Sequence, residues 1–341
     1  MMSAAPEQSF QPPPQPPPPP PTTEEKPRAP RPIKLRPFAI GLGVLGLIVL
    51  IGGFAKFIPG GIGTGAAVLF SGILLFALSL IPLPVVPGEE EPLSFFDKVT
   101  GIFYEPSRVF RNLRYHPHWV GAFAVICVLT AIYSIAFVQR ITPERIVDHT
   151  TQKLAEMGPP FAPPPEALEA IKTQQLQSLK SPAERVGTVA KQFVGIFAFS
   201  CFVAALSLLG ILAFGGRINF WQSLAVTFFA TLPIVVIQKV LGLVILYLKT
   251  PDDLHPILNQ ETTLQDNLGI LFSPADHPIL FVIASFIGLT SFYALWLRAK
   301  GLHMGATRVG KGAAWGVAIT LWVLLLLMVT IITALFPGFI A

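Results

Sequence analysis

The stretch FFATLPIVVIQKVLGLVILYL, residues 228–248, is apolar over nearly its whole length and is long enough to cross a lipid bilayer. About 20 residues of helix span a hydrocarbon core of about 30 Å, because a helix rises about 1.5 Å per residue. Backbone groups in hydrocarbon must be hydrogen-bonded within their own segment, so a helix is the expected form. The stretch also holds Pro233, Gln238 and Lys239. It therefore predicts a membrane protein and raises the question of what a lysine does inside the span.

The composition extends this prediction to the whole chain. Of 341 residues, 52% are hydrophobic and 13% are charged, and the mean hydropathy is +0.63. Soluble domains carry roughly 25% charged residues, so this balance is typical of a protein that crosses a membrane several times. Seven apolar runs have spanning length: residues 37–58, 62–86, 118–139, 192–214, 221–248, 278–297 and 313–336. The predicted fold class is an all-α polytopic membrane protein with about seven transmembrane helices.

The basic residues flank the apolar runs and form no patch with interleaved aromatic residues. The net charge of +5 therefore indicates membrane topology and gives no support to a nucleic-acid partner. If the N-terminus is cytoplasmic, the inside segments hold 14 Lys and Arg residues and the outside segments hold 9, seven of them in one long connection. Because positive charge favours the cytoplasmic side, we expect the N-terminus inside and the C-terminus outside.

The N-terminal region differs in composition from the rest. Residues 1–36 contain QPPPQPPPPPP and end in a basic cluster, which predicts a disordered, proline-rich cytoplasmic tail. Such a tail is either a solvated tether or a ligand for an aromatic-lined groove of a protein partner. Residues 37–87 follow as two transmembrane helices, in which Gly61, Gly65 and Gly72 recur at spacings that let helices approach closely.

Residues 94–117, SFFDKVTGIFYEPSRVFRNLRYHP, predict an amphipathic segment. Aromatic and aliphatic side chains, Phe110 among them, recur at roughly helical spacing between basic residues, and Pro106 interrupts the pattern. One interpretation is a helix that lies on the cytoplasmic membrane surface. The other is a soluble helix that packs on the ends of the spans. The pattern is the same for both.

The connection over residues 140–190 predicts a helical hairpin outside the membrane. Its two polar stretches, PERIVDHTTQKLAEM and PEALEAIKTQQLQSLK, each begin with Pro followed by Glu, which suits the first turn of a helix. The sequence GPPFAPPP separates them. The second helix is expected to lead into the fourth span.

Residue types needed for catalysis are missing from the predicted spans. These spans contain no Asp or Glu, and His118 lies at the edge of the third. This excludes a pair of intramembrane aspartates and a Ser-His arrangement for hydrolysis in the bilayer. No H-E-x-x-H run occurs, and Cys127 and Cys201 form no metal-binding or disulfide pattern. We therefore expect no enzymatic activity, no cofactor and no metal.

The polar residues of the opening stretch allow two interpretations. Pro233 removes one backbone hydrogen bond of the helix, which predicts a kink. Gln238 and Lys239 just beyond it could line a polar crevice. The alternative is a structural kink, with Lys239 reaching outer-leaflet phosphates or a loop carboxylate such as Asp252 or Asp253.

Three segments, in order, resemble bacterial members of the Yip-one family, the Ypt/Rab-interacting membrane proteins. They are FFDKVTGIFYEPSRVFRNLRYHPHWVGAFAV, FWQSLAVTFFATLPIVV and LVILYLKTPDDLHPILNQETTLQDNLGILFSP. The last contains Pro251, Asp252 and Asp253 directly after the span. The resemblance covers about residues 93–337 and implies a five-helix membrane bundle with a cytoplasmic N-terminus. The first two spans and the proline-rich tail depart from the family's minimal pattern as an N-terminal addition.

The resemblance implies an integral membrane protein of a bacterial inner membrane that acts without catalysis. Eukaryotic relatives bind Rab GTPases and act in vesicle traffic, a role that does not transfer to a bacterial chain. We expect a scaffold or membrane-organising factor that contacts membrane lipids and a protein partner through the tail or residues 94–117, and homo-oligomers are compatible with the sequence. The alternative is a small-solute transporter or channel with a crevice around Pro233, Gln238 and Lys239.

Overall fold

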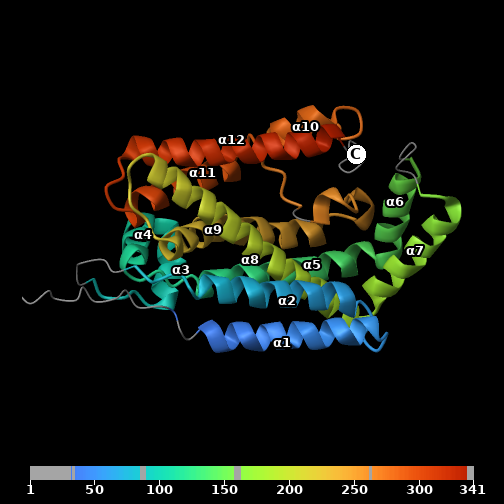
Figure 1. Cartoon of the computed structure of the whole chain (residues 1–341). Coiled ribbons are helices and arrows are strands. Elements are labelled where there is room, and N and C mark those ends of the chain that lie inside the picture. The colour runs from blue at the N-terminus through green and yellow to red at the C-terminus, as the bar shows by residue number, and fades with distance from the viewer. Residues whose placement is uncertain (1–31, 33–34, 85–89, 157–162, 261–262, 336–341) are drawn as a thin grey trace, which may run out of the picture.

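The computed structural model describes residues 32, 35–84, 90–156, 163–260 and 263–335, and Figure 1 shows them as a bundle of helices. Six helices are long and apolar enough to cross a membrane. They are α1 (Leu35–Phe54), α2 (Gly61–Leu78), α5 (Val120–Ile141), α8 (Pro182–Ala213), α9 (Phe220–Leu248) and α12 (Lys311–Leu335). The described residues form only two isolated bridges and no strand. The protein is therefore an all-α polytopic membrane protein, and this prediction is confirmed.

Helix α9, which contains the opening stretch, lies between α5, α8 and α11. Its first turns, from Phe220 to Ala230, are buried at every position, because small and apolar side chains face all directions. Asn219 caps the helix: its side chain accepts a hydrogen bond from the Trp221 amide, and its own amide donates to the Gln222 side chain. The helix continues through Pro233 to Leu248.

The sixth predicted span, residues 278–297, is not a continuous helix. It divides into α10 (Pro278–Ser285) and α11 (Leu289–Gly305), which together run along α12. The Leu289 amide donates to the Asp266 carbonyl, and the Thr290 amide donates to the Asp266 carboxylate at 2.7 Å. A side chain on Gly288 would collide with Asn267 and Asp266, so the close approach of this loop requires glycine there. The break is therefore stabilised by the loop at Asp266, which accepts hydrogen bonds from the first amides of α11.

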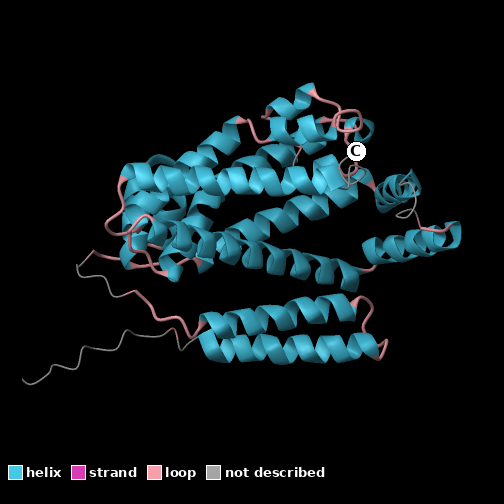
Figure 2. Cartoon of the chain, turned by 45° about the horizontal axis from the view of Figure 1, so that its top comes forward, coloured by secondary structure: helices cyan, strands magenta, loops and turns pink. Residues whose placement is uncertain are grey.

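Helices α1 and α2 form a hairpin that packs on the rest of the bundle through α8 (Figure 2). Glycines on α2 make the hairpin tight, because a side chain on Gly65 would meet the backbone of Leu50 and one on Gly72 would meet that of Gly43. The spacing of small residues in the sequence therefore marks a real helix contact.

The predicted helical hairpin is formed by α6 (Pro143–Glu156) and α7 (Pro165–Lys180), and its place outside the membrane stays a prediction. Residues 157–162, most of the predicted separator, lie outside the described residues. After Ser181, whose hydroxyl accepts from the Glu184 amide, the chain continues directly as α8. The fourth span therefore begins ten residues earlier than its apolar run, because α8 extends through the polar residues before it.

At the opposite end of the bundle lie α3 (Phe95–Tyr104) and α4 (Pro106–Tyr115) (Figure 1). Pro106 begins α4 and separates the two helices, as the sequence predicts. Helix α1 begins at this same end. The predicted tail, residues 1–36, lies almost wholly outside the described residues.

Candidate functional site

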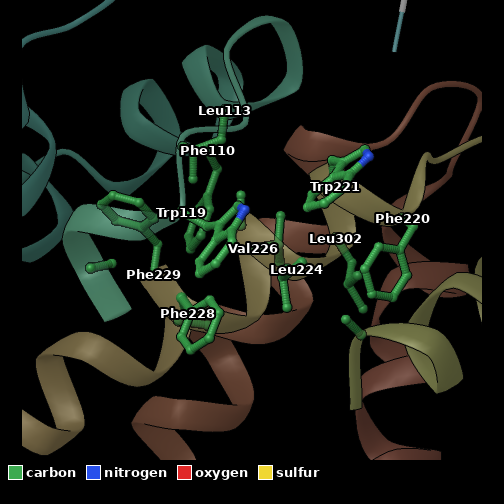
Figure 3. Close-up of a cluster of buried hydrophobic side chains, with 14 of the residues drawn as sticks. Phe110, Leu113, Trp119, Phe220, Trp221, Leu224, Val226, Phe228, Phe229 and Leu302 are labelled. Carbon is green, nitrogen blue, oxygen red and sulfur yellow. The ribbon is translucent and has the colours of Figure 1, made fainter. Parts of the chain in front are cut away.

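Helix α4 uses its apolar face to pack on the bundle. Val109, Phe110 and Leu113 are fully buried, and Figure 3 shows Phe110 and Leu113 reaching from α4 toward Trp119 and Val226. A side chain on Gly301 would meet both Phe110 and Val226 at about 3 Å or less, so glycine in α11 makes room for the aromatic ring. For α4, the interpretation of a helix packed on the span ends is therefore confirmed.

Polar groups tie the preceding linker to α4. The buried Asn112 side chain donates to the Glu91 carbonyl at 2.8 Å and accepts from the Leu93 amide at 3.2 Å. Lys98 of α3 is buried as well, with its Nζ 3.5 Å from Nδ1 of His118, and burial lowers the pKa of this lysine. These contacts fix the position of the linker and of α3 against α4 and the start of α5.

Helix α3 differs from α4 because much of its aromatic surface is uncovered. Phe96 is 74% exposed and Tyr104 is 69% exposed, and Phe95 and Phe103 are also exposed. Ile102 alone among its apolar side chains is fully buried. The two halves of the amphipathic segment thus do different things: α4 packs, and α3 presents aromatic side chains at the end of the bundle.

Lys239 does not face the lipid phosphates. Its side chain is only 5% exposed, and Nζ lies 4.7 Å from the centroid of the Tyr133 ring, over the ring of a fully buried residue of α5. The Tyr133 hydroxyl donates to the Asn259 carbonyl at 2.6 Å, and the Thr263 hydroxyl donates to the Gly242 carbonyl at 2.6 Å. The loop after α9 therefore folds back over the lysine, and an aromatic face offsets part of the cost of burying its charge.

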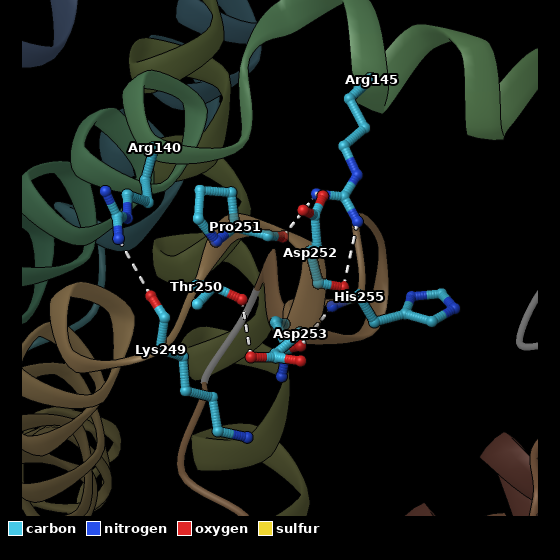
Figure 4. Close-up of polar contacts among 9 residues, drawn as sticks. Arg140, Arg145, Lys249, Thr250, Pro251, Asp252, Asp253 and His255 are labelled. Carbon is cyan, nitrogen blue, oxygen red and sulfur yellow. Dashed lines mark hydrogen bonds and ion pairs between the residues drawn. The ribbon is translucent and has the colours of Figure 1, made fainter.

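The loop carboxylates suggested as partners of Lys239 bind other groups. Figure 4 shows Arg145 reaching from α6 to the loop, where its guanidinium donates to the Pro251 carbonyl and to the Asp252 carboxylate at 3.1 Å. Asp253 accepts from the Thr250 hydroxyl at 2.6 Å. Asp252 thus ties the loop to α6, and Asp253 is bonded within the loop itself. The pairing of Lys239 with a loop carboxylate stays a prediction.

Gln238 faces a different environment from its neighbour. It lines a pocket of about 200 Å³ between α9, α11 and α12, together with Thr290, Ser291 and Arg298. Arg298 lies seven residues before the end of α11 and lines the same pocket as Gln238. Lys239 is not among the residues that line this pocket, because successive helical residues point about 100° apart. A crevice around Pro233, Gln238 and Lys239 stays a prediction.

Some of these residues were missed by sequence reasoning. Arg298 was counted as a flanking charge after the sixth apolar run, because hydropathy ends that run at residue 297, whereas α11 continues to Gly305. Tyr133 gave no signal beyond an aromatic residue in an apolar run, and its partner lies 126 residues further along. Pro106 and Phe110 are placed as packing residues of α4, and the roles of Pro233, Gln238 and Lys239 in function stay predictions.

Comparison with known proteins gives one family. Residues 100–332 match the Yip1 domain, a region that begins inside α3 and ends near the end of α12. The match leaves out α1 and α2. Neither curated proteins nor solved structures give a match. Because the matched region is more than half of the chain and coincides with the bundle of α4 to α12, the protein belongs to the Yip1 domain family of integral membrane proteins.

Proposed function

We propose that the protein is a non-enzymatic scaffold or membrane-organising factor of a bacterial inner membrane, with α3, α4 and the N-terminal tail in the cytoplasm. The aromatic surface of α3 is the observation that carries this proposal. Exposed apolar patches on a folded protein are typical of contacts with a protein or a membrane. The start of α1 lies at the same end, so the proline-rich tail and α3 can act on one partner.

Photocrosslinking in intact membranes tests this proposal. A photoreactive amino acid is introduced at Phe96 or at Tyr104, and at Glu169 on α7 as an exposed control at the opposite end. We expect adducts with a protein or with phospholipid at the two α3 positions and not at Glu169. A chain without residues 1–31 then shows whether the tail contributes to the protein adducts. Absence of adducts from α3, or the same adducts from Glu169, would count against the proposal.

The orientation is tested separately by cysteine labelling. Tyr104→Cys on α3 and Lys172→Cys on α7 place exposed thiols at the two ends of the bundle, while the native Cys127 and Cys201 are buried. In intact cells a membrane-impermeant maleimide should label the α7 position and leave the α3 position unlabelled. The reverse pattern would place the N-terminus outside and overturn the charge argument.

A second candidate function is transport of a small anionic solute. The pocket with Gln238 and Arg298 favours it, because a cation and an amide donor inside a membrane bundle are typical of solute pathways. Arg298→Gln and Gln238→Leu should each lower anion flux into proteoliposomes, whereas Lys239→Leu should lower it only if the protein unfolds. If none of a panel of small anions moves faster than through empty liposomes, or if the pocket variants transport normally, this candidate fails.

A further inference from the structure

A second polar pocket lies at the α3–α4 end of the bundle. It has a volume of about 350 Å³ and lies between the start of α4, the last turns of α11 and the start of α12. The residues that matter for its chemistry are Ser107, Trp296, Lys300, His303, Lys311 and Trp315. This volume is within the range of small-ligand sites, which begin at about 300 Å³.

The pocket is positively charged and holds no carboxylate. Lys300 places its Nζ 4.6 Å from the centroid of the Trp296 ring, and neither Lys300 nor Lys311 pairs with an Asp or Glu of the described ranges. Helix α12 begins at Lys311, so its first backbone N–H groups and the positive end of its dipole are at the same place. Every charged feature of this pocket therefore favours an anion.

His303 can add a further donor. Its Nδ1 lies 2.9 Å from the Val309 carbonyl, which can only accept, so Nδ1 carries a hydrogen. The other ring nitrogen, Nε2, is then an acceptor in the neutral ring and a donor when the ring is protonated. The Ser107 hydroxyl at the start of α4 is a neutral donor on the facing wall.

Two tryptophans line the pocket, which is typical of the depth of lipid headgroups in a membrane protein. Trp296 is 37% exposed and Trp315 is 39% exposed, on neighbouring helices that both belong to the membrane bundle. Tryptophan is enriched where a membrane protein passes from hydrocarbon to water, because its ring is apolar and its N–H is polar. Basic pockets between transmembrane helices at this level bind the headgroups of anionic lipids.

We propose that this pocket binds the phosphate headgroup of one anionic phospholipid, with Lys300 and Lys311 as the charged contacts. Trp296 and Trp315 flank the lipid at the level of its glycerol. A lipid fits the site better than free phosphate does, because two partly exposed tryptophans line the pocket together with the lysines. This inference goes beyond the proposed scaffold role and does not rest on it.

Titration of the purified full-length protein with lipid tests the proposal. Dioleoyl phosphatidylglycerol and dioleoyl phosphatidylcholine are added in detergent, and bound lipid is counted by native mass spectrometry. We expect one tight phosphatidylglycerol molecule and no phosphatidylcholine equivalent. A cation near an anionic lipid surface contributes about fivefold in binding, so Lys300→Ala should weaken the tight site about fivefold and Lys300→Ala with Lys311→Ala about 25-fold.

Matched variants separate the pocket from general charge. Lys191→Ala with Lys249→Ala removes the same charge from exposed positions outside the pocket and should leave the tight site unchanged. Lys300→Arg with Lys311→Arg keeps the charge and should retain binding, which shows that positive charge at these two positions is what the site needs. Equal binding of both lipids by the unaltered protein, equal loss in the two alanine pairs, or displacement of the lipid by millimolar inorganic phosphate would overturn the proposal.

Discussion

The two ends of the bundle hold their short helices in different ways. At one end, the ten residues of α4 bury five side chains, including Val109, Phe110 and Leu113. At the other end, the 16 residues of α7 bury none, and α6 buries two, Ile146 and Val147. Polar contacts act there as well: the Arg145 guanidinium binds the loop after α9, and ion pairs join α6 to α7.

We call the α4 end the fixed end and the α6–α7 end the adjustable end. Apolar burial is insensitive to salt and to moderate changes of pH, whereas exposed ion pairs are screened by salt and imidazoles titrate near neutrality. The α4 end is therefore expected to move with the membrane bundle as one body. The α6–α7 end is expected to respond to its surroundings, and four predictions test the contrast.

The largest effect is expected from Phe110→Ala. Removal of a fully buried aromatic ring leaves a cavity between α4, α9 and α11 and should destabilise the protein by about 3–5 kcal/mol. Thermal unfolding in detergent, followed by near-ultraviolet circular dichroism, measures the loss. Phe96→Ala on α3 is the matched control, because this ring is 74% exposed and its removal should change stability by less than about 0.5 kcal/mol. Similar losses from the two variants would show that α4 is not the packed helix.

The next effect is expected from Arg145→Ala. The guanidinium donates to two carbonyl groups and to the Asp252 carboxylate, so its loss should loosen the loop over 249–255 by about 1–2 kcal/mol. Hydrogen exchange of these backbone amides should rise, while exchange in α4 stays unchanged. Arg145→Lys should restore little, because an ammonium cannot reproduce the forked contact. Arg108→Ala, which removes one exposed pair with Glu105, serves as the control and should leave the loop unaffected.

Apolar runs and proline-glutamate starts were sufficient to predict most of the helices. The spans of α1, α5, α9 and α12 agree with the predicted runs because hydropathy reports which residues avoid water. Helix α2 begins with its run but ends at Leu78, eight residues before the run 62–86 does. Hydropathy does not show, however, whether an apolar run forms one continuous helix. The break before α11 depends on hydrogen bonds from Asp266, which lies in a loop 24 residues before Thr290 in the chain.

The neighbours of the polar span residues could not be predicted, for a related reason. Gln238 and Lys239 are adjacent in sequence, and no local pattern states which helix each one faces. The structure separates them, with Tyr133 beside Lys239 and Arg298 in the pocket of Gln238. These partners come from helices that are distant in the chain, so only the packing of the bundle identifies them.

A third prediction concerns pH at the adjustable end. The rings of His149 on α6 and His255 in the loop lie 4.9 Å apart, and burial together with nearby cations such as Lys153 lowers the pKa of both below the ordinary value near 6.5. The folded state thus favours the neutral rings. Their contribution to stability is fully present above about pH 6.5 and is lost as the pH falls through the lowered pKa values.

Hydrogen exchange of α6 and the loop, corrected for the intrinsic pH dependence, measures this effect. Protection should fall as the pH is lowered below about 6.5, while α4 remains protected. His149→Gln with His255→Gln should remove the pH dependence without removing the fold. Equal loss of protection at both ends of the bundle would contradict the contrast between them.

The smallest effect is expected from Lys172→Ala on α7. Its Nζ lies 2.6 Å from the Asp148 carboxylate of α6, but both side chains are more than half exposed, so the pair should contribute only about 0.2–1 kcal/mol to holding α7 against α6. The rate of proteolysis of the hairpin is compared at low and high salt. Salt screens the Lys172–Asp148 pair in the unaltered protein, whereas the variant lacks this pair. Limited proteolysis of the hairpin should therefore become faster with salt in the unaltered protein and respond less in Lys172→Ala. If salt had the same effect on both proteins, the ion pair would not be what keeps α7 in place. The few apolar contacts of α6 would then have to hold this end, as the buried side chains of α4 hold the other.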